Sequence, residues 1–160
     1  MTRILMRAVF IFFLAHAAVS PAYAQDSDAA AQAPATPIGP PAPGKAQIVF
    51  YRAREFLGSA LTYPVLDNRG EEIGRLANGR YFILTVAPGN HSYDIDKYFH
   101  ENVVVTIPDV AANQTYYIKV SVRSGLVGIF PGPVGTDMVR SSDLEFEKVA
   151  AKLTLYSPHE

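Results

Sequence analysis

Apolar residues recur at every second position through much of residues 46–122, which is the side-chain period of a β-strand. Residues 46–52 are apolar on both faces, so this segment predicts a strand in the middle of a sheet. Residues 116–122 show the clearest alternation in the chain, with polar side chains on the expected outer face. The pattern therefore indicates a chain dominated by β-strands.

Turn residues separate the predicted strands. Residues 67–70, 78–79 and 88–90 supply the glycine, proline and asparagine that tight turns need. Pro64 lies inside one predicted strand and cannot donate to a ladder, so that strand is expected to be bulged or at an edge. Further strands are predicted at residues 61–65, 73–76, 80–86, 91–95 and 103–107. The fold class that follows is mainly β, an antiparallel β-sandwich of six to eight short strands.

The period changes near the end of the chain. Ser142 followed by Glu145 forms a capping box, which is typical of a helix N-terminus. Apolar residues at helical spacing then predict one C-terminal α-helix over residues 143–153. A last strand over residues 152–156 is the alternative.

The N-terminus has the three parts of a secretory signal peptide. Arg3 and Arg7 precede an apolar run over residues 8–19, which is too short to span a bilayer. Small residues before the bond between Ala24 and Gln25 predict cleavage there. We therefore expect a periplasmic or secreted protein without a transmembrane span; a retained N-terminal anchor helix is the alternative.

The expected signal peptide covers residues 1–24. Residues 25–44 are rich in proline and alanine and predict a disordered linker, because such a segment buries too little apolar surface to offset its ordering entropy. Residues 45–157 form the expected β-sandwich domain.

Composition removes several function classes. The chain has 160 residues and a formal net charge of −1, which becomes −3 once Arg3 and Arg7 leave with the signal peptide. No basic footprint for nucleic acid is present. The sequence contains no cysteine, which excludes disulfides, thiolate metal ligands, cysteine nucleophiles and a lipid anchor on cysteine.

One stretch concentrates residues with metal-binding chemistry. His91, Asp94, Asp96, His100 and Glu101 fall within eleven positions and are the candidate ligands of a small molecule or a metal ion. Strand parity places His91 on the face opposite to the two aspartates, and no established ligand spacing is present.

The alternative interpretation of this stretch is structural. Asp94 and Asp96 would then form exposed cross-strand ion pairs with Lys119 or Arg123, each worth less than about 1 kcal/mol. His91 would cap or pack the neighbouring Pro-Gly turn.

Residues 124–135 form an uncharged apolar segment rich in glycine and proline. The first interpretation is a buried, irregular connection between the last long strand and the helix. The second is an exposed loop that docks a partner or a membrane surface, because exposed apolar patches mark interaction sites. Its contact residues would be Leu126, Val127, Ile129 and Phe130.

A series of short motifs extends from residue 44 to residue 123. In order, the motifs are Gly44-Lys45-Ala46, Ile48, Tyr51-Arg52, Tyr63-Pro64-Val65, Asp67-Asn68, Ile73-Gly74, Leu76, Asn78-Gly79, Tyr81-Phe82, Val86, Pro88-Gly89, His91, Ala112, Tyr116-Tyr117 and, just beyond, Gly125. This order resembles the bacterial envelope family called domain of unknown function 2846, many of whose members are lipoproteins. The turn at residues 86–91 is also similar to β-sandwich modules of the PEGA and carboxypeptidase-regulatory type. The resemblance implies an envelope location but no catalytic residues.

Three functional hypotheses remain. The leading one is a secreted periplasmic, non-catalytic β-sandwich module in cell-envelope interaction or structure, with an envelope protein or glycan as partner. The alternative is a periplasmic small-ligand or metal-binding protein that uses residues 91–101. The third is a hydrolase, although no Gly-x-Ser-x-Gly elbow is present. No catalytic motif and no cofactor are predicted.

Overall fold

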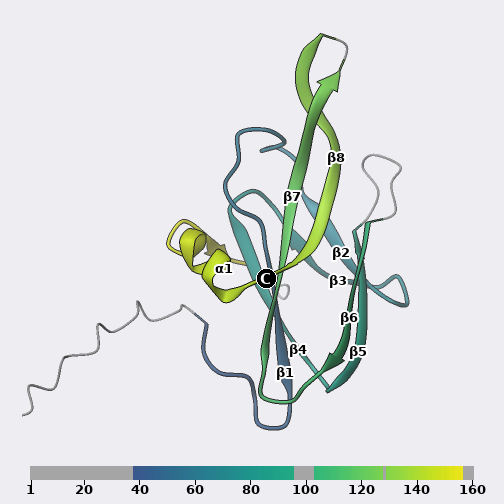
Figure 1. Ribbon diagram of the computed structural model, residues 1–160, viewed down its shortest axis with the longest axis vertical. Helices are drawn as coiled ribbons and strands as arrows, with labels where there is room; N and C mark the ends of the chain where they lie inside the picture. Colours follow the sequence, from purple (N-terminus) through teal and green to yellow (C-terminus); the bar gives the residue numbers. More distant parts are fainter. Residues whose placement is uncertain (1–37, 96–102, 128, 157–160) are drawn as a thin grey trace, which may run out of the picture. The chain divides into compact units, whose positions relative to one another are not determined.

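The computed structural model describes residues 38–95, 103–127 and 129–156. These residues form nine strands and one helix (Figure 1). The elements are β1 (Ala46–Tyr51), β2 (Tyr63–Asp67), β3 (Glu72–Leu76), β4 (Arg80–Val86), β5 (Gly89–Ile95), β6 (Val103–Val110), β7 (Thr115–Val127), β8 (Phe130–Ser141), α1 (Asp143–Ala150) and β9 (Thr154–Leu155). The mainly β fold with one C-terminal helix is confirmed, but β7 and β8 are long, with 13 and 12 residues.

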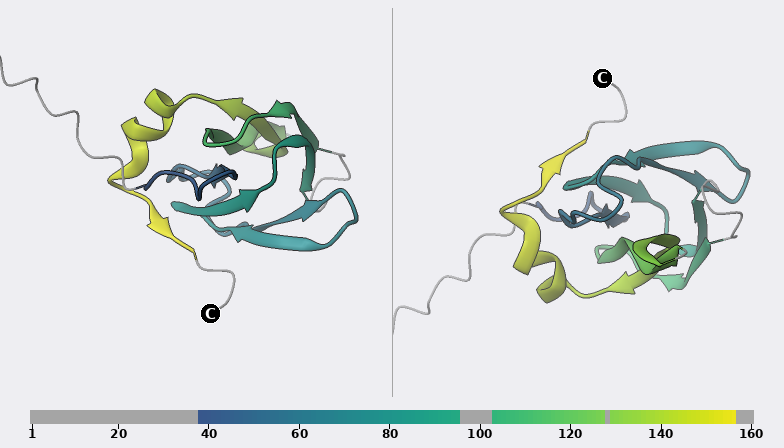
Figure 2. Two further views of the ribbon diagram at one scale, coloured as in Figure 1. Left: turned by 90° about the horizontal axis from the view of Figure 1, so that it is seen from below. Right: turned by 90° about the horizontal axis from the view of Figure 1, so that it is seen from above.

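The strands form two sheets that face each other (Figure 2). One has five strands in the order β8-β7-β1-β4-β9, and the other has four in the order β3-β2-β5-β6. Most pairs are antiparallel, as expected, but β1 pairs with β7 and β4 with β9 in parallel. Parallel neighbours need a long connection, and the whole four-stranded sheet lies between β1 and β7 along the chain.

The main core fills the space between the sheets. Phe50 of β1 stacks on Phe82 of β4 with 4.9 Å between ring centroids, and Tyr93 of β5 meets Phe50 edge-on at 5.0 Å. All three side chains are buried. These rings join the two sheets and supply the apolar area on which a domain without disulfides depends.

A second, smaller core lies on the outer face of the five-stranded sheet, beneath α1. Phe146 of the helix is fully buried among Tyr51, Tyr81 and Tyr117, with ring centroids 5.2, 5.7 and 5.2 Å away. Burial raises the pKa of the Tyr51 and Tyr117 hydroxyls. Since cores cover both faces of β1, all six of its residues are buried, as their two-sided apolar pattern predicts.

The end of the predicted linker packs against this second core. Ile38 is only 8% exposed, and the Gln47 side-chain amide donates to the Gly39 carbonyl oxygen at 2.7 Å. The packed part of the chain therefore begins before residue 45, because Ile38 in the Pro-rich segment packs into the second core.

Turns and helix ends follow their sequence signals closely. Gly70 and Gly79 have φ angles of 79° and 71°, which favour glycine at these turns. At the start of α1 the Ser142 hydroxyl accepts a hydrogen bond from the Glu145 amide at 3.2 Å, as the capping box predicts. The helix ends at Ala150, before the predicted residue 153, so both the helix and the alternative last strand, β9, are present.

Strand β2 is bulged but is not an edge strand. Its register with β3 shifts between Val65 and Leu66, and β5 lies on its other side. Pro64 is tolerated there because the pairs between β2 and β5 begin only at Val65.

Arg52 has the largest fully buried side chain among the described residues, which its position at a strand end did not suggest. Its guanidinium donates to the carbonyl oxygens of Leu61 and Gly58 at 2.5 and 2.6 Å and lies over the Tyr63 ring. Burial lowers the pKa of this guanidinium. Arg52 thereby fixes the loop between β1 and β2 against the end of the sandwich.

Candidate functional site

The most distinctive surface feature is the far end of the β7–β8 hairpin. Strand β7 pairs with β1 only as far as Lys119, opposite Tyr51, whereas its pairing with β8 continues to Val127. The hairpin therefore extends past the other strands, as Figure 1 shows. We call residues 124–135 the arm; a register shift between Arg123 and Ser124 separates it from the rest of the hairpin.

The arm exposes large apolar side chains. The exposed fractions are 72% for Leu126, 57% for Val127, 84% for Ile129 and 71% for Phe130. The interpretation of this segment as a buried irregular connection is therefore wrong: it is a regular hairpin, and its apolar residues face outward. Glycines, prolines and apolar residues on both faces hide the alternation that marks a strand in the sequence.

Two glycines allow the strands of the arm to interlock. A Cβ on Gly125 would lie 2.8 Å from Cγ1 of Val134, and one on Gly132 would lie 2.9 Å from Cγ2 of Val127. Each valine thus folds over the glycine of the opposite strand. The glycine content of the arm is explained by close cross-strand packing.

Charged groups return at the base of the arm. The Arg123 guanidinium donates to a carboxylate oxygen of Asp137 at 3.0 Å, and both side chains are about half exposed. Farther down β8, Arg140 lies over the Tyr116 ring, 6.0 Å from its centroid. The apolar arm therefore ends at the Arg123–Asp137 ion pair, and Arg140 lies farther along the hairpin, opposite Ile118.

His91 packs a turn, as its structural interpretation predicted. Its Nε2 atom is 2.8 Å from the Ala87 carbonyl oxygen, and its ring lies parallel to that of Tyr93 with 6.2 Å between centroids. Burial, with a smaller contribution from the Asp67 carboxylate, raises the pKa of Tyr93 to about 12. A pocket of about 230 Å³ adjoins these residues, smaller than the roughly 300–1,000 Å³ of typical ligand sites.

The other candidate ligands are only partly described. Asp96, His100 and Glu101 lie outside the described residues. Asp94 is described, and its buried Oδ1 atom has no hydrogen-bond partner among the described residues. Residues 38–95, 103–127 and 129–156 contain no cluster of three metal-ligating side chains, so the metal site remains a prediction.

The expected ion pairs of Asp94 with Lys119 or Arg123 are wrong. Asp94 belongs to β5 and the two basic residues belong to β7, and these strands lie in different sheets. Arg123 pairs with Asp137 on β8, and the expected pairs of Asp96 lie outside the described residues. The alternation of apolar and polar residues indicates which face of a strand is buried, but it does not tell which strands become neighbours.

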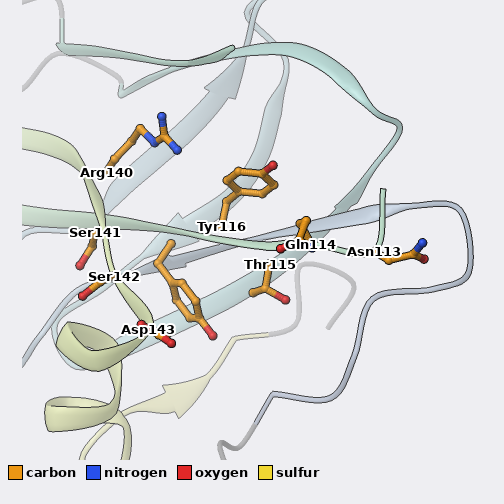
Figure 3. A pocket seen from close by; sticks show the side chains of 9 residues that line it. Asn113, Gln114, Thr115, Tyr116, Arg140, Ser141, Ser142 and Asp143 are labelled. Carbon is orange, nitrogen blue, oxygen red and sulfur yellow. The ribbon is translucent and has the colours of Figure 1, made fainter. Parts of the chain in front are cut away.

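A polar pocket of about 480 Å³ lies where β8 ends and the chain enters α1. The first pair between β7 and β8 joins Tyr117 to Ser141. Thr115 and Tyr116, at the start of β7, therefore have no partner on β8, and an open notch lies beside them. Figure 3 shows Arg140 and Tyr116 on one side of this notch, and Ser141 where the chain turns into the helix. The lining residues are Asn113, Gln114, Thr115, Tyr116, Tyr117, Arg140, Ser141, Ser142 and Asp143. Hydroxyl, amide and guanidinium groups suit a small polar ligand; sequence reasoning missed the pocket because its residues come from three separate elements.

No helix within the described ranges is long and apolar enough to cross a bilayer. A comparison with known families matches residues 42–134 to the family described as protein of unknown function, DUF2846. This match confirms the family resemblance stated for residues 44–123. No curated protein and no solved structure matches the chain.

Proposed function

We propose that this chain, which belongs to the DUF2846 family, is a secreted, non-catalytic β-sandwich module of the cell envelope that binds its partner through the arm. The exposed apolar arm is the observation that carries this proposal. The signal-peptide pattern over residues 1–24 and the Pro-rich segment that follows support an envelope location.

The arm is costly unless something covers it. Apolar surface left in water forfeits about 25 cal/mol per Å², and soluble proteins rarely collect such surface without a binding role. Four large apolar side chains are gathered at one end of the arm, and both cores of the domain lie elsewhere. Such a cluster of exposed apolar side chains at the end of one hairpin indicates an interaction site.

Binding to envelope extract tests the proposal. The Phe130→Asp variant should lose capture of envelope components while its thermal unfolding stays unchanged, because Phe130 is exposed and belongs to neither core. Phe56→Asp is the matched control, since Phe56 is 97% exposed and lies in the loop between β1 and β2. Equal capture by both variants, or unfolding of the Phe130 variant, would contradict the proposal.

A second candidate function is the binding of a small ligand or a metal ion by residues 91–101. The buried Asp94 Oδ1 atom favours it, because such a carboxylate oxygen normally has a partner. Calorimetric titration with divalent cations tests this candidate. Heat of binding that disappears in His91→Ala and His100→Ala variants would support it, and unchanged binding would exclude these histidines. The hydrolase hypothesis stays a prediction.

A further inference from the structure

Resting on the proposed function, we infer that the partner of the arm is an anionic lipid surface, into which the arm inserts its apolar end.

The arm is apolar on both faces. Successive residues of a strand point to opposite sides, and the neighbours Leu126 and Val127 are both exposed, as are Ile129 and Phe130. A protein surface docked on one face would leave the other face in water. Lipid chains surround an inserted element and cover both faces together.

The backbone of the arm is unsuited to strand addition by a protein partner. Strand β8 is the edge of its sheet, but Pro131 and Pro133 have no N–H to donate to an incoming strand. Within the arm the two strands pair with each other, up to Val127 opposite Phe130. This pairing satisfies only the backbone groups that the two strands turn toward each other, and the outer edges of the arm stay open. The arm therefore suits the hydrated interfacial region of a bilayer and not its hydrocarbon core.

A second copy of the chain would cover too little area. With roughly 150–250 Å² for a large apolar side chain, the exposed parts of Leu126, Val127, Ile129 and Phe130 total on the order of 500 Å². A dimer that joined one face of each arm would bury well below the roughly 1,200–2,000 Å² of a stable interface. Lipid association has no such threshold, because it needs no complementary shape.

The length of the arm fits the membrane interface. From Ser124 to Val127 the strand advances about 10 Å at roughly 3.3 Å per residue. This matches the depth of about 5–10 Å reached by interfacial elements and is far below the ~30 Å hydrocarbon core. The arm would insert into one leaflet and would not span the bilayer.

The charge of the β7–β8 hairpin complements anionic headgroups. At the base of the arm Arg123 and Asp137 form an ion pair, and Lys119 and Arg140, farther along the hairpin, leave β7 and β8 with three cations and one anion, although the whole chain has a net charge of −1. Arg123 directly precedes the uncharged arm, so an inserted arm places this guanidinium near the phosphate groups. Basic residues beside an apolar anchor are a common signature of binding to anionic membranes.

The absence of tryptophan from the sequence allows a site-specific test. A Phe130→Trp substitution puts the one tryptophan of the protein on the arm, and Phe56→Trp puts it at an exposed position on the loop between β1 and β2; excitation near the red edge of the tryptophan band avoids the tyrosines. Each protein, isolated as its host secretes it and checked by mass spectrometry for its N-terminus, is mixed with vesicles of phosphatidylethanolamine and phosphatidylglycerol. Brominated lipids then report the depth of each fluorophore.

For the Phe130→Trp protein we expect a blue shift of the tryptophan emission and quenching by lipids brominated at shallow positions. Added salt and omission of phosphatidylglycerol should weaken both effects. The Phe56→Trp protein should show neither, even if residues 8–19 are retained and bind the vesicles. No response of the Phe130→Trp protein would overturn the lipid inference, as would an emission shift without vesicles that tracks dimer formation by sedimentation. If vesicles cause no change in the Phe130→Trp emission while the Phe130→Asp variant still loses capture from envelope extract, the proposed function survives with a protein partner. If that capture is unchanged too, both fail.

Discussion

The two halves of β7 show how one strand can serve two purposes. In the first half, Ile118 and Val120 are fully buried against the opposite sheet, while their neighbours face outward. In the second half, beyond Arg123, no residue up to Val127 is buried, and Leu126 is 72% exposed. Apolar residues in the first half stabilise the sandwich, whereas those in the second contribute little to folding and remain available for binding.

The aromatic residues repeat this contrast. Phe82 is 1% exposed and stacks on Phe50, whereas Phe130 is 71% exposed. The two side chains are chemically identical, so their environments alone decide what each contributes. Substitutions in the core should therefore change stability, and substitutions in the arm should change binding.

The largest expected effect comes from truncating each of these phenylalanines. Phe82→Ala should lower the free energy of unfolding by about 3–5 kcal/mol, because it opens a cavity between the sheets. Phe130→Ala should change it by less than about 0.5 kcal/mol, since the ring is mostly in water already. Urea unfolding of both variants measures the difference. A loss above about 2 kcal/mol in the Phe130 variant would place the arm in the folding core and contradict the comparison.

Strands of the body with an uninterrupted alternation are predictable from the sequence. Residues 80–86 were predicted as a strand with the bounds that β4 has, and the turns at Gly70 and Gly79 fall where expected. In both cases the signal is local: a period of two, or a glycine that tolerates a positive φ.

Pairing partners and the arm were not predictable from local signals. The parallel contact between β1 and β7 joins segments far apart in the chain, and a period of two carries no information about neighbours. In the arm, Gly125 and Gly132 replace the apolar residues that would complete an alternation. Arg52 was missed for a different reason: a charged residue at a strand end is usually exposed, and only the carbonyl groups of the next loop make its burial possible.

Glycine substitutions should have effects of intermediate size and also compare the body with the arm. In the body, a Cβ on Gly74 would lie 2.8 Å from the buried Phe82 ring, which cannot move without disturbing its stack on Phe50. Gly74→Ala should therefore lower the free energy of unfolding by about 1–3 kcal/mol.

The matched substitution in the arm is Gly125→Ala. Its Cβ would lie just as close to Val134, but that side chain is 36% exposed and can rotate into solvent. The strain should be small, and the loss of unfolded-state entropy on replacing glycine offsets part of it, so the net change should stay below about 1 kcal/mol. Equal losses in the two variants, measured by urea unfolding, would show that the arm is packed as rigidly as the body.

The last comparison, with a small expected effect on both stability and binding, concerns the junction of the two regions. Asp137→Asn removes one half-exposed ion pair of Arg123, so the free energy of unfolding should fall by less than about 1 kcal/mol. The same change raises the net charge of the β7–β8 hairpin by one, and one such charge beside an anionic membrane is worth about 1 kcal/mol. Partitioning onto phosphatidylglycerol vesicles should therefore strengthen about fivefold at low salt and stay unchanged on neutral vesicles. Vesicle titrations of Asp137→Asn in the Phe130→Trp protein measure this effect. Unchanged or weaker partitioning onto the anionic vesicles would mean that the base of the arm does not reach the headgroups.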